Sequence, residues 1–385
     1  MTVPEPVRRA VRGVSTPCAV VDLAALDRNA DDLVRRAGSM PIRVASKSVR
    51  VRALIERVLA RRGFAGVLAY SLAEAAWLVR HGQPDVLLAY PSVDRAAFVE
   101  VAADPMLREA ITLMVDHPDQ VAMVADAADP RHPVRVCLDV DASLRIGPVH
   151  LGVRRSPVHT AEQAAAAARR IAATRGVRLV GLMFYDAQIA GLPDSSPAVR
   201  LVKWASAREL LARRAAVVDA VSAFAELEVV NGGGTGSLHI TGRDPHLTEL
   251  AAGSGLFGPT LFDGYRAFSP DPAAYLVLSV TRRPAPDVAT CYSGGYIASG
   301  PPGWSRVPQP CHPEGLSLLR AEGAGEVQTP VTGDPTRHLR VGDQVWFRHA
   351  KAGELCERLD TVHLVEDGAI VASVPTYRGE GMNFG

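Results

Sequence analysis

Lysine is scarce in this sequence. The chain of 385 residues contains 42 lysines and arginines together, but its only lysines are Lys47, Lys203 and Lys351. Arginine therefore carries almost all of the positive charge, and we expect the arginine pairs to lie on solvated helix faces rather than in binding patches. Lys203, within a helical pattern, is expected at the surface. We interpret a lysine kept against this background as a position where an amine is needed.

Paired cysteines, a bias of charge and long apolar runs are also missing. The five cysteines are scattered and form no CxxC pair, which argues against a disulfide framework and for a reducing cytoplasm. The net charge of +1 gives no electrostatic attraction to nucleic acid or to a membrane surface. No apolar run reaches the ~18 residues of a membrane span, and residues 1–16 lack the apolar region of a signal peptide. We therefore expect a cytoplasmic globular protein without nucleic-acid or membrane partners.

Short apolar runs alternate with helical patterns through most of the first 260 residues. Runs such as 85–91 and 111–115 are apolar throughout, which is typical of parallel strands buried on both faces. Roughly eight strand–helix units spread over ~250 residues fit a closed barrel better than an open sheet. The sequence therefore predicts an α/β fold, with a (β/α)8 TIM-type barrel over residues 16–268.

Two of the predicted helices begin with a capping box. Ser71 is followed three residues later by Glu74, and Thr160 by Gln163. This spacing lets each side chain accept a hydrogen bond from the backbone at the other position. We therefore expect a helix to begin after Ser71 and another after Thr160.

The pattern changes after about residue 269. Short β-type runs such as 275–280, 344–347 and 361–365 are separated by proline and glycine. This is typical of antiparallel strands joined by turns. We predict a second, mostly antiparallel β domain over residues 269–385, which the segment 1–15 is expected to join.

Lys47 follows a short apolar run and precedes a helical pattern. A charge at the carboxyl end of a buried strand is costly. Desolvation there lowers the pKa of an amine and makes it a nucleophile or a Schiff-base former. The alternative is a lysine whose charged end reaches out to solvent from the strand end.

A loop of glycine, serine and threonine spans residues 232–237, and a second one, 253–255, follows one strand later. Neither fits the dinucleotide or P-loop pattern, and the first could be only a tight turn. Such loops also offer backbone N–H groups and hydroxyls to an anion, and the loops after barrel strands seven and eight frequently bind phosphate. Two such loops together with Lys47 point to pyridoxal 5′-phosphate, an aldehyde with a phosphate anchor.

Several segments, in order along the chain, carry a family resemblance. They are Thr16-Pro17 with 20–23, Arg43 four residues before Lys47, 72–75, and 85–91. With the later glycine loops and the C-terminal β domain, the chain resembles fold-type III enzymes that depend on pyridoxal phosphate. The D-threonine aldolase and D-serine dehydratase-like group, related to alanine racemase, is the one it is most similar to.

The resemblance implies roles for individual residues. Lys47 would form the Schiff base with the cofactor, Tyr185 would pack beside it, and Arg43 would belong to the cofactor site. An arginine would sit near the pyridoxal ring, but the family's Gly-x-x-Arg-x-Gly pattern is altered here by an insertion, which leaves Arg145 and Arg154 as alternatives. The residues that would hold the phosphate are Gly233, Gly234, Thr235, Gly253 and Ser254.

The resemblance leaves metal binding open. Relatives bind a divalent metal through a His-x-Cys or His-x-Asp pair in the C-terminal domain, and the matching positions here are His349 and Lys351. A protonated lysine is not a metal ligand. His349 remains a candidate ligand, and the alternative is that both residues are catalytic groups that contact the substrate without metal.

The predicted activity is that of an aldolase acting on a β-hydroxy-α-amino acid. Removal of the hydroxyl proton by metal-bound water or by His349 would drive cleavage of the Cα–Cβ bond. Chemistry at Cα–H is the alternative, as in a D-amino acid dehydratase or deaminase, or in a racemase in which the resemblance would make Tyr296 a base supplied by the partner subunit.

A pyridoxal phosphate-binding regulator without turnover is an alternative of another class, although small carriers of this fold lack a C-terminal β domain. The resemblance also implies a homodimer and a small amino acid as substrate.

Overall fold

The computed structural model describes residues 2–351 and 353–385. The chain forms two compact units, each described here by itself. We call them the barrel unit and the β unit. The barrel unit comprises Leu33–Ser46, Leu59–Ala252 and Phe384–Gly385, and the β unit comprises Met1–Asp32, Lys47–Val58 and Gly253–Asn383.

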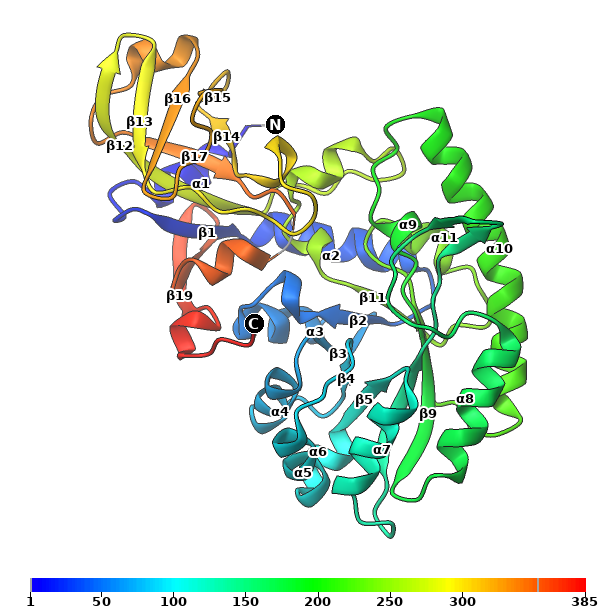
Figure 1. The fold of residues 1–385 in the computed structure, drawn as a ribbon. Helices are drawn as coiled ribbons and strands as arrows, with labels where there is room; N and C mark the ends of the chain where they lie inside the picture. Colours follow the sequence, from blue (N-terminus) through cyan, green and yellow to red (C-terminus); the bar gives the residue numbers. More distant parts are fainter. Residues whose placement is uncertain (1, 352) are drawn as a thin grey trace. The chain divides into compact units, whose positions relative to one another are not determined.

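Eight parallel strands close into a barrel, which confirms the predicted fold class (Figure 1). The strands are short and largely buried because side chains on both faces pack against protein. The closed order is β10-β11-β2-β3-β4-β5-β6-β9. The strands are β2 (Ile42–Ala45), β3 (Phe64–Ala69), β4 (Val86–Leu88), β5 (Ile111–Val115), β6 (Val134–Asp139), β9 (Val177–Phe184), β10 (Val229–Gly232) and β11 (Glu249–Ala252).

Helices follow the barrel strands, and both predicted N-caps are confirmed, although the full capping box forms only at Thr160. The Ser71 hydroxyl accepts the Glu74 N–H at 3.2 Å, and the Glu74 carboxylate accepts the Tyr70 N–H at 2.7 Å. Thr160 and Gln163 cap their helix reciprocally. The helices along this part of the chain are α2 (Leu23–Ala37), α3 (Arg52–Leu59), α4 (Leu72–Arg80), α5 (Arg95–Ala103), α6 (Pro105–Ala110), α7 (Pro118–Ala127), α8 (Ala161–Ala173), α9 (Ala187–Ala190), α10 (Pro197–Ser222) and α11 (Leu238–Thr241).

The β unit is built on a nine-stranded, mostly antiparallel sheet. The run at 18–22, which the sequence assigned to the barrel, instead lies between β12 and β18 of this sheet. Its five residues are all buried, as in a barrel strand, and it pairs in parallel with β18. The strands are β1 (Cys18–Asp22), β12 (Ala274–Ala285), β13 (Val288–Tyr292), β14 (Gln309–His312), β15 (Ser317–Leu318), β16 (Gln328–Thr332), β17 (Gln344–Arg348), β18 (Thr361–Glu366) and β19 (Ala369–Pro375).

The N-terminal segment packs on this sheet through α1 (Glu5–Ala10). Val7 and Val11 belong to one hydrophobic cluster with Tyr275 and Trp346, which come from β12 and β17. Burial of these apolar side chains stabilises the contact between the segment and the sheet.

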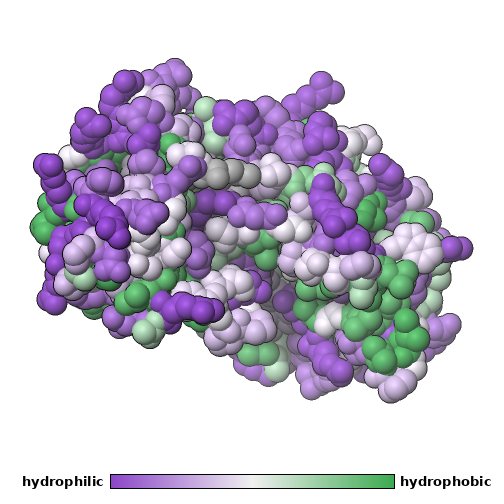
Figure 2. Space-filling view, turned by 90° about the horizontal axis from the view of Figure 1, so that it is seen from above, coloured by the Kyte–Doolittle hydropathy of each residue, from purple (hydrophilic) through white to green (hydrophobic). Residues whose placement is uncertain are grey.

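The surface is mixed in character. Figure 2 shows hydrophilic residues over most of the visible face, interrupted by separate hydrophobic patches. Among the described residues, no helix is both long enough and apolar enough to cross a membrane.

Candidate functional site

Polar side chains and a glycine loop follow the carboxyl ends of the barrel strands. Each lies at the last residue of a strand or within two residues after it. Because all eight strands are parallel, these positions share the end of the barrel at which TIM-barrel sites occur. They are Tyr70 after β3, Tyr90 after β4, Asp116 after β5, Asp139 at the end of β6, Tyr185 after β9 and Gly233 after β10.

Lys47 lies in the short 3₁₀ turn η1 (Ser46–Ser48), directly after β2. Its backbone is held in place, since the Arg50 Nε donates to the Lys47 carbonyl at 3.0 Å. A Cβ atom on Gly353 would lie 2.4 Å from that carbonyl oxygen, so the chain can pass there only with glycine. The half-buried lysine therefore occupies the strand end that the sequence predicted.

The glycine loop at 232–237 closes on itself. The Gly234 N–H donates to the Ser237 hydroxyl at 3.1 Å, and the Ser237 N–H donates to the Gly234 carbonyl at 2.9 Å. Gly233 has a φ of +78°, a conformation that favours glycine. A Cβ atom on Gly234 would lie 2.8 Å from the Cβ of Ala190. The loop is a tight turn with no room for larger residues at Gly234.

Two buried charged residues hold this loop. Arg36, from the end of α2, donates through Nη1 to the Thr235 carbonyl at 2.6 Å. Asp186 accepts hydrogen bonds from the hydroxyls of Ser237, at 3.1 Å, and Thr241, at 2.7 Å. Burial raises the pKa of Asp186, and these hydroxyls oppose the rise. The sequence analysis missed both residues, and Arg36 places a positive charge beside a loop suited to an anion.

Tyr185 connects the glycine loop to an arginine. A Cβ atom on Gly234 would lie 3.7 Å from the Tyr185 Cε2. The guanidinium carbon of Arg155 lies 5.3 Å from the Tyr185 ring centroid and 5.5 Å from that of Tyr90. Both distances are in the range of cation–π attraction. The barrel unit therefore brings Gly234, Tyr185 and Arg155 together.

The two predicted arginines lie elsewhere in the insertion. Arg145 belongs to β7 (Leu144–Ile146), and its Nε donates to the buried carboxylate of Asp141 at 3.1 Å. Arg154 is exposed. Arg155, one residue further, is the arginine that the structure places beside Tyr185.

Asp139 is a titratable group that the sequence analysis did not select. Burial, together with the charges of Asp116 and Asp141, raises the pKa of this carboxyl to about 7, against the opposing charge of Arg155. A carboxyl group at the end of a barrel strand that exchanges its proton near neutral pH is typical of functional sites.

Arg43 does not lie at the strand ends where the cofactor was predicted. It is the second residue of β2, and its guanidinium donates to both oxygens of Glu249, at 2.8 and 2.7 Å, and to Asp85 at 2.9 Å. Glu249 is the first residue of β11, and Asp85 precedes β4. Arg43 therefore closes the amino-terminal end of the barrel strands, and the structure gives it a structural role in place of the predicted cofactor contact.

Gly253 and Ser254 directly follow β11, and Ser254 begins the short turn η2 (Ser254–Leu256). The Leu256 carbonyl accepts a hydrogen bond from the Asn29 side-chain amide at 3.0 Å. The loop is thus anchored within the β unit, and its contact with a phosphate stays a prediction.

His349 and Lys351 differ in their surroundings. His349 is 1% exposed and packs edge-on against Phe257, with ring centroids 5.9 Å apart. Burial, and to a smaller extent the charge of Arg348, lower the pKa of His349 to about 4. Its imidazole is therefore neutral at neutral pH. The Lys351 ammonium donates to the Ser299 carbonyl at 3.1 Å.

His349 is the candidate metal ligand, and the described residues do not complete the family's ligand pattern around it. Over residues 2–351 and 353–385, no three histidine, cysteine, aspartate or glutamate side chains are gathered as ligands of one ion. Lys351, at the second ligand position of the family's pattern, is a hydrogen-bond donor.

Tyr296 is enclosed in the β unit. Its hydroxyl is buried and has no hydrogen-bond partner among the residues described. Burial raises its pKa, and the nearby Cys356 and Glu354 raise it further. Its predicted alternative role, as a racemase base supplied by the partner subunit, stays a prediction.

Comparison with known sequences gives a family match and a relative. Residues 21–260 match the family model described as alanine racemase, N-terminal domain. A 3-hydroxy-D-aspartate aldolase of Paracoccus denitrificans (strain Pd 1222) is 28% identical over 250 residues, which cover 63% of this chain. The matched segment covers only 60% of that relative's length.

Comparison with solved structures extends over nearly the whole chain. The D-threonine aldolase of Filomicrobium marinum has a TM-score of 0.80 at 22% identity, with 95% of this chain and 96% of that chain covered. The D-threo-3-hydroxyaspartate dehydratase of Delftia sp. HT23 has a TM-score of 0.76 at 20% identity, with 95% and 98% covered. At these identities the likeness shows a shared fold.

Proposed function

The chain belongs to the family of the alanine racemase N-terminal domain, and from this premise we propose that it is a lyase dependent on pyridoxal 5′-phosphate. Its reaction would be that of an aldolase, breaking or forming the Cα–Cβ bond of a β-hydroxy-α-amino acid. The observation that carries the proposal is the glycine loop, held by Arg36 and lying beside Tyr185. The loop follows the carboxyl end of β10, and Lys47 follows the carboxyl end of β2.

The residues at this end of the barrel strands fit the cofactor. The tight loop at Gly233 and Gly234, with the charge of Arg36 and the Thr235 hydroxyl, would hold the phosphate. Gly253 and Ser254, after the next strand, would complete that set. Tyr185 and Arg155 would flank the ring, and the Lys47 amine would bind the aldehyde. When bound, the pyridoxal group draws electrons from the Cα of the amino acid.

The chain must also accept the proton of the substrate's hydroxyl group. We assign this role to His349, which is neutral at neutral pH. Neither ring nitrogen makes a hydrogen bond of ordinary geometry in the described part of the chain, although the Ala274 backbone raises its pKa. Lys351 would contact the substrate through its ammonium group. Asp139, with its pKa of about 7, would hold or release a proton near the ring.

The names of the relatives support the substrate class. A 3-hydroxy-D-aspartate aldolase, a D-threonine aldolase and a D-threo-3-hydroxyaspartate dehydratase are all named for β-hydroxy-α-amino acids of the D series. We carry this class over to the present chain, together with a homodimeric assembly and a cytoplasmic location.

A spectral and product assay tests the proposal. The purified protein is supplied with pyridoxal phosphate and then with D-threonine, D-serine, 3-hydroxy-D-aspartate, D-alanine and α-methylated β-hydroxy amino acids. From the β-hydroxy amino acids we expect an aldehyde and a smaller amino acid, and from D-alanine, which has no hydroxyl group, no cleavage. A keto acid with ammonia would make the chain a dehydratase, and loss of optical activity a racemase. Cofactor binding without any product would indicate the regulator, and absence of the visible band of lysine-bound pyridoxal would contradict the whole proposal.

Lys47→Ala should abolish both the visible band and the turnover. Loss of a covalent nucleophile lowers rates by about 10³-fold or more. Lys47→Arg is the matched control, because it keeps the positive charge but cannot form the covalent bond. Activity within tenfold of the parent in either variant would refute the role of Lys47.

Chelation tests the metal. We expect dialysis against EDTA to change the aldolase rate by no more than about twofold, because Lys351 stands where the family's pattern has a metal ligand. The check is the rate before dialysis, after it, and after Mn²⁺ or Mg²⁺ is added back. A rate that falls with EDTA and returns with the metal would show that other ligands complete a site.

A further inference from the structure

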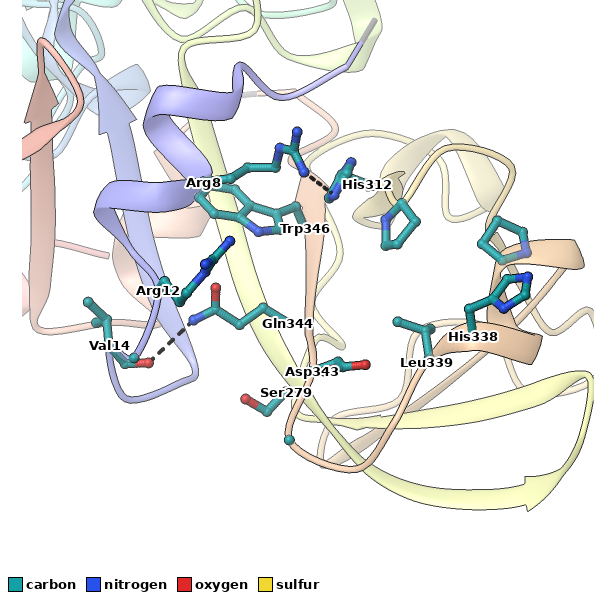
Figure 3. Close-up of a pocket in the computed structure, with 14 residues that line it drawn as sticks. Arg8, Arg12, Val14, Ser279, His312, His338, Leu339, Asp343, Gln344 and Trp346 are labelled. Atoms are coloured by element: carbon teal, nitrogen blue, oxygen red, sulfur yellow. Dashed lines mark hydrogen bonds between the residues drawn. The ribbon is translucent and has the colours of Figure 1, made fainter.

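A cavity in the β unit, lying beside α1, is lined by an arginine that already serves the protein (Figure 3). The volume of this cavity is about 650 Å³. Arg8 donates through Nε to the Val3 carbonyl at 3.2 Å and forms an ion pair with Glu5. Its Nη1 lies 2.8 Å from the His312 Nε2. These contacts hold the N-terminal segment in place, and we assign no ligand to the cavity.

Lys203, in the barrel unit, is a buried amine that the proposed reaction does not use. It is one of three lysines beside 39 arginines in the chain, and it lies on the buried face of α10. Its Nζ donates to the Leu192 carbonyl at 3.0 Å and to the Asp194 carboxylate at 2.8 Å. Only 8% of the Lys203 side chain and 13% of the Asp194 side chain are exposed. Desolvation offsets much of the attraction in such a pair, so net stability is a weak reason to keep it.

Both acceptors of Lys203 lie in the segment 191–196, which joins α9 to α10. The short helix α9 packs beside α10 (Figure 1). At its start, the Asp186 carbonyl accepts the N–H groups of Ile189 and Ala190 at 2.8 and 2.9 Å. A helix of four residues is not stable by itself. The position of its far end therefore depends on tertiary contacts such as those of Lys203.

The helix α9 touches both the glycine loop and Tyr185. The Ala190 Cβ is the atom that a Cβ on Gly234 would meet at 2.8 Å. A Cβ on Gly191, directly after α9, would lie 3.9 Å from the Tyr185 hydroxyl. A shift of the far end of α9 would therefore move a wall of the glycine loop.

The charge of Lys203 also reaches the surroundings of the loop. His239 belongs to α11, which follows the glycine loop directly. Burial and the charges of Arg36 and Lys203 lower the pKa of His239, and the charge of Asp194 opposes them. The pair of Lys203 and Asp194 therefore lies close to the arginine that holds the loop.

We propose that Lys203 is a positioning residue for the loop that would hold the cofactor's phosphate. Its ammonium holds the segment 191–196, which fixes the far end of α9 and the wall that Ala190 forms against Gly234. This role rests on the proposed function, and Lys203 itself would touch neither the cofactor nor the substrate. An ammonium suits the role because it is a compact charge with rotatable donors, whereas a guanidinium donates in a rigid planar fork.

Titration of the cofactor-free full chain with pyridoxal phosphate, and with pyridoxal, which lacks the phosphate, tests this role. Lys203→Met removes the amine and keeps a long side chain. Arg135→Met is the matched control, because Arg135 pairs with Glu228 at 2.7 Å in the same unit, near the amino-terminal ends of the strands. The double variant Lys203→Met/Asp194→Asn leaves no buried carboxylate without its cation, and it gives the same comparison if the single variant does not fold.

We expect Lys203→Met to weaken the binding of pyridoxal phosphate about tenfold and that of pyridoxal less than twofold, because only the phosphate needs the loop. Arg135→Met should change both affinities less than twofold. Hydrogen exchange over residues 187–194 of the cofactor-free protein should be faster in Lys203→Met than in the parent, and unchanged in Arg135→Met.

An equal loss for the two ligands in Lys203→Met, or no loss for either, would overturn the role of Lys203 and leave the proposed function standing. Unchanged hydrogen exchange over residues 187–194 would also overturn it. A parent protein that binds neither ligand would contradict the proposed function, and the role of Lys203 with it.

Discussion

The two ends of the barrel strands carry polar side chains of different kinds. At the amino-terminal end, the guanidinium of Arg43 is matched by Glu249 and Asp85, and the Asn231 amide donates to Glu249 at 2.6 Å. At the carboxyl end, Asp139 is held partly neutral and Arg155 lies over aromatic rings instead of forming a carboxylate pair.

This difference separates stability from chemistry. Charges that satisfy one another are fixed in one ionisation state and one geometry, which suits a structural role. A buried carboxyl group with a raised pKa is a costly arrangement of the kind that functional sites carry. We therefore expect that substitutions can disrupt the two ends independently of each other.

The largest effect is expected at the amino-terminal end. Arg43→Leu leaves Glu249 buried without its cation, and breaking a buried pair costs about 3–5 kcal/mol of unfolding free energy. Denaturation by urea, followed by circular dichroism, measures the loss. Arg178→Leu is the matched control, because Arg178 pairs with Glu228 at 2.6 Å but is half-exposed, and exposed pairs contribute about 1 kcal/mol or less. A similar small loss in both variants would remove the contrast between the ends.

Asp139→Asn should have an effect that depends on pH. The pKa of this carboxyl is about 7 in the folded chain and about 4 when unfolded, so the folded state binds more protons between these values. Stability from Asp139 is therefore full below pH ~4 and is lost as the pH rises through ~7.

Asp139→Asn has no group to ionise at this position. Its free energy of unfolding relative to the parent should therefore be about 2–4 kcal/mol higher at pH 9 than at pH 5. Urea denaturation at the two pH values measures this difference. A difference between variant and parent that is the same at both pH values would show that burial does not raise the pKa of Asp139.

The sequence was sufficient for the barrel but not for the strand that borders it. Uniformly apolar runs predict strands buried on both faces, and the eight barrel strands have that environment. The run at 18–22 has the same pattern because β1 is also buried on both faces, but its partners are β12 and β18. A hydrophobic pattern predicts that a strand is buried, but it does not predict which strand lies beside it.

Tertiary hydrogen bonds account for the other misplacements. Lys203 was expected at the surface, but it is 6% exposed and its ammonium donates to the Leu192 carbonyl at 3.0 Å and to Asp194 at 2.8 Å. Arg43 was placed near the cofactor because of its spacing from Lys47. Its carboxylate partners come from other strands, which spacing along one strand does not reveal.

The candidate site was partly predictable for a related reason. Glycines and a lone lysine at strand ends are visible in the sequence, and Lys47 and the loop at 233–235 lie at the predicted strand ends. Arg36 and Asp186 support the loop through a backbone carbonyl and two hydroxyls, contacts that leave no pattern in the sequence. The insertion around Arg145 changes the spacing of the family's arginine pattern. Spacing alone therefore does not distinguish Arg154 from Arg155.

The smallest effect distinguishes the three arginines at the carboxyl end. Arg155→Ala removes a cation over Tyr185 and Tyr90, and we expect the affinity for pyridoxal phosphate to fall about tenfold, or 1.4 kcal/mol. Arg154→Ala, one residue away and exposed, is the matched control and should change it less than twofold. Absorbance titration of the cofactor-free protein measures both.

Because the charge of Arg155 lowers the pKa of Asp139, its removal should also raise that pKa, which infrared titration of the carboxyl can follow. If Arg154→Ala or Arg145→Ala weakened the cofactor more than Arg155→Ala, the arginine beside the ring would be one of those that the family pattern suggested. Arg155 would then belong with Arg43 among the structural charges.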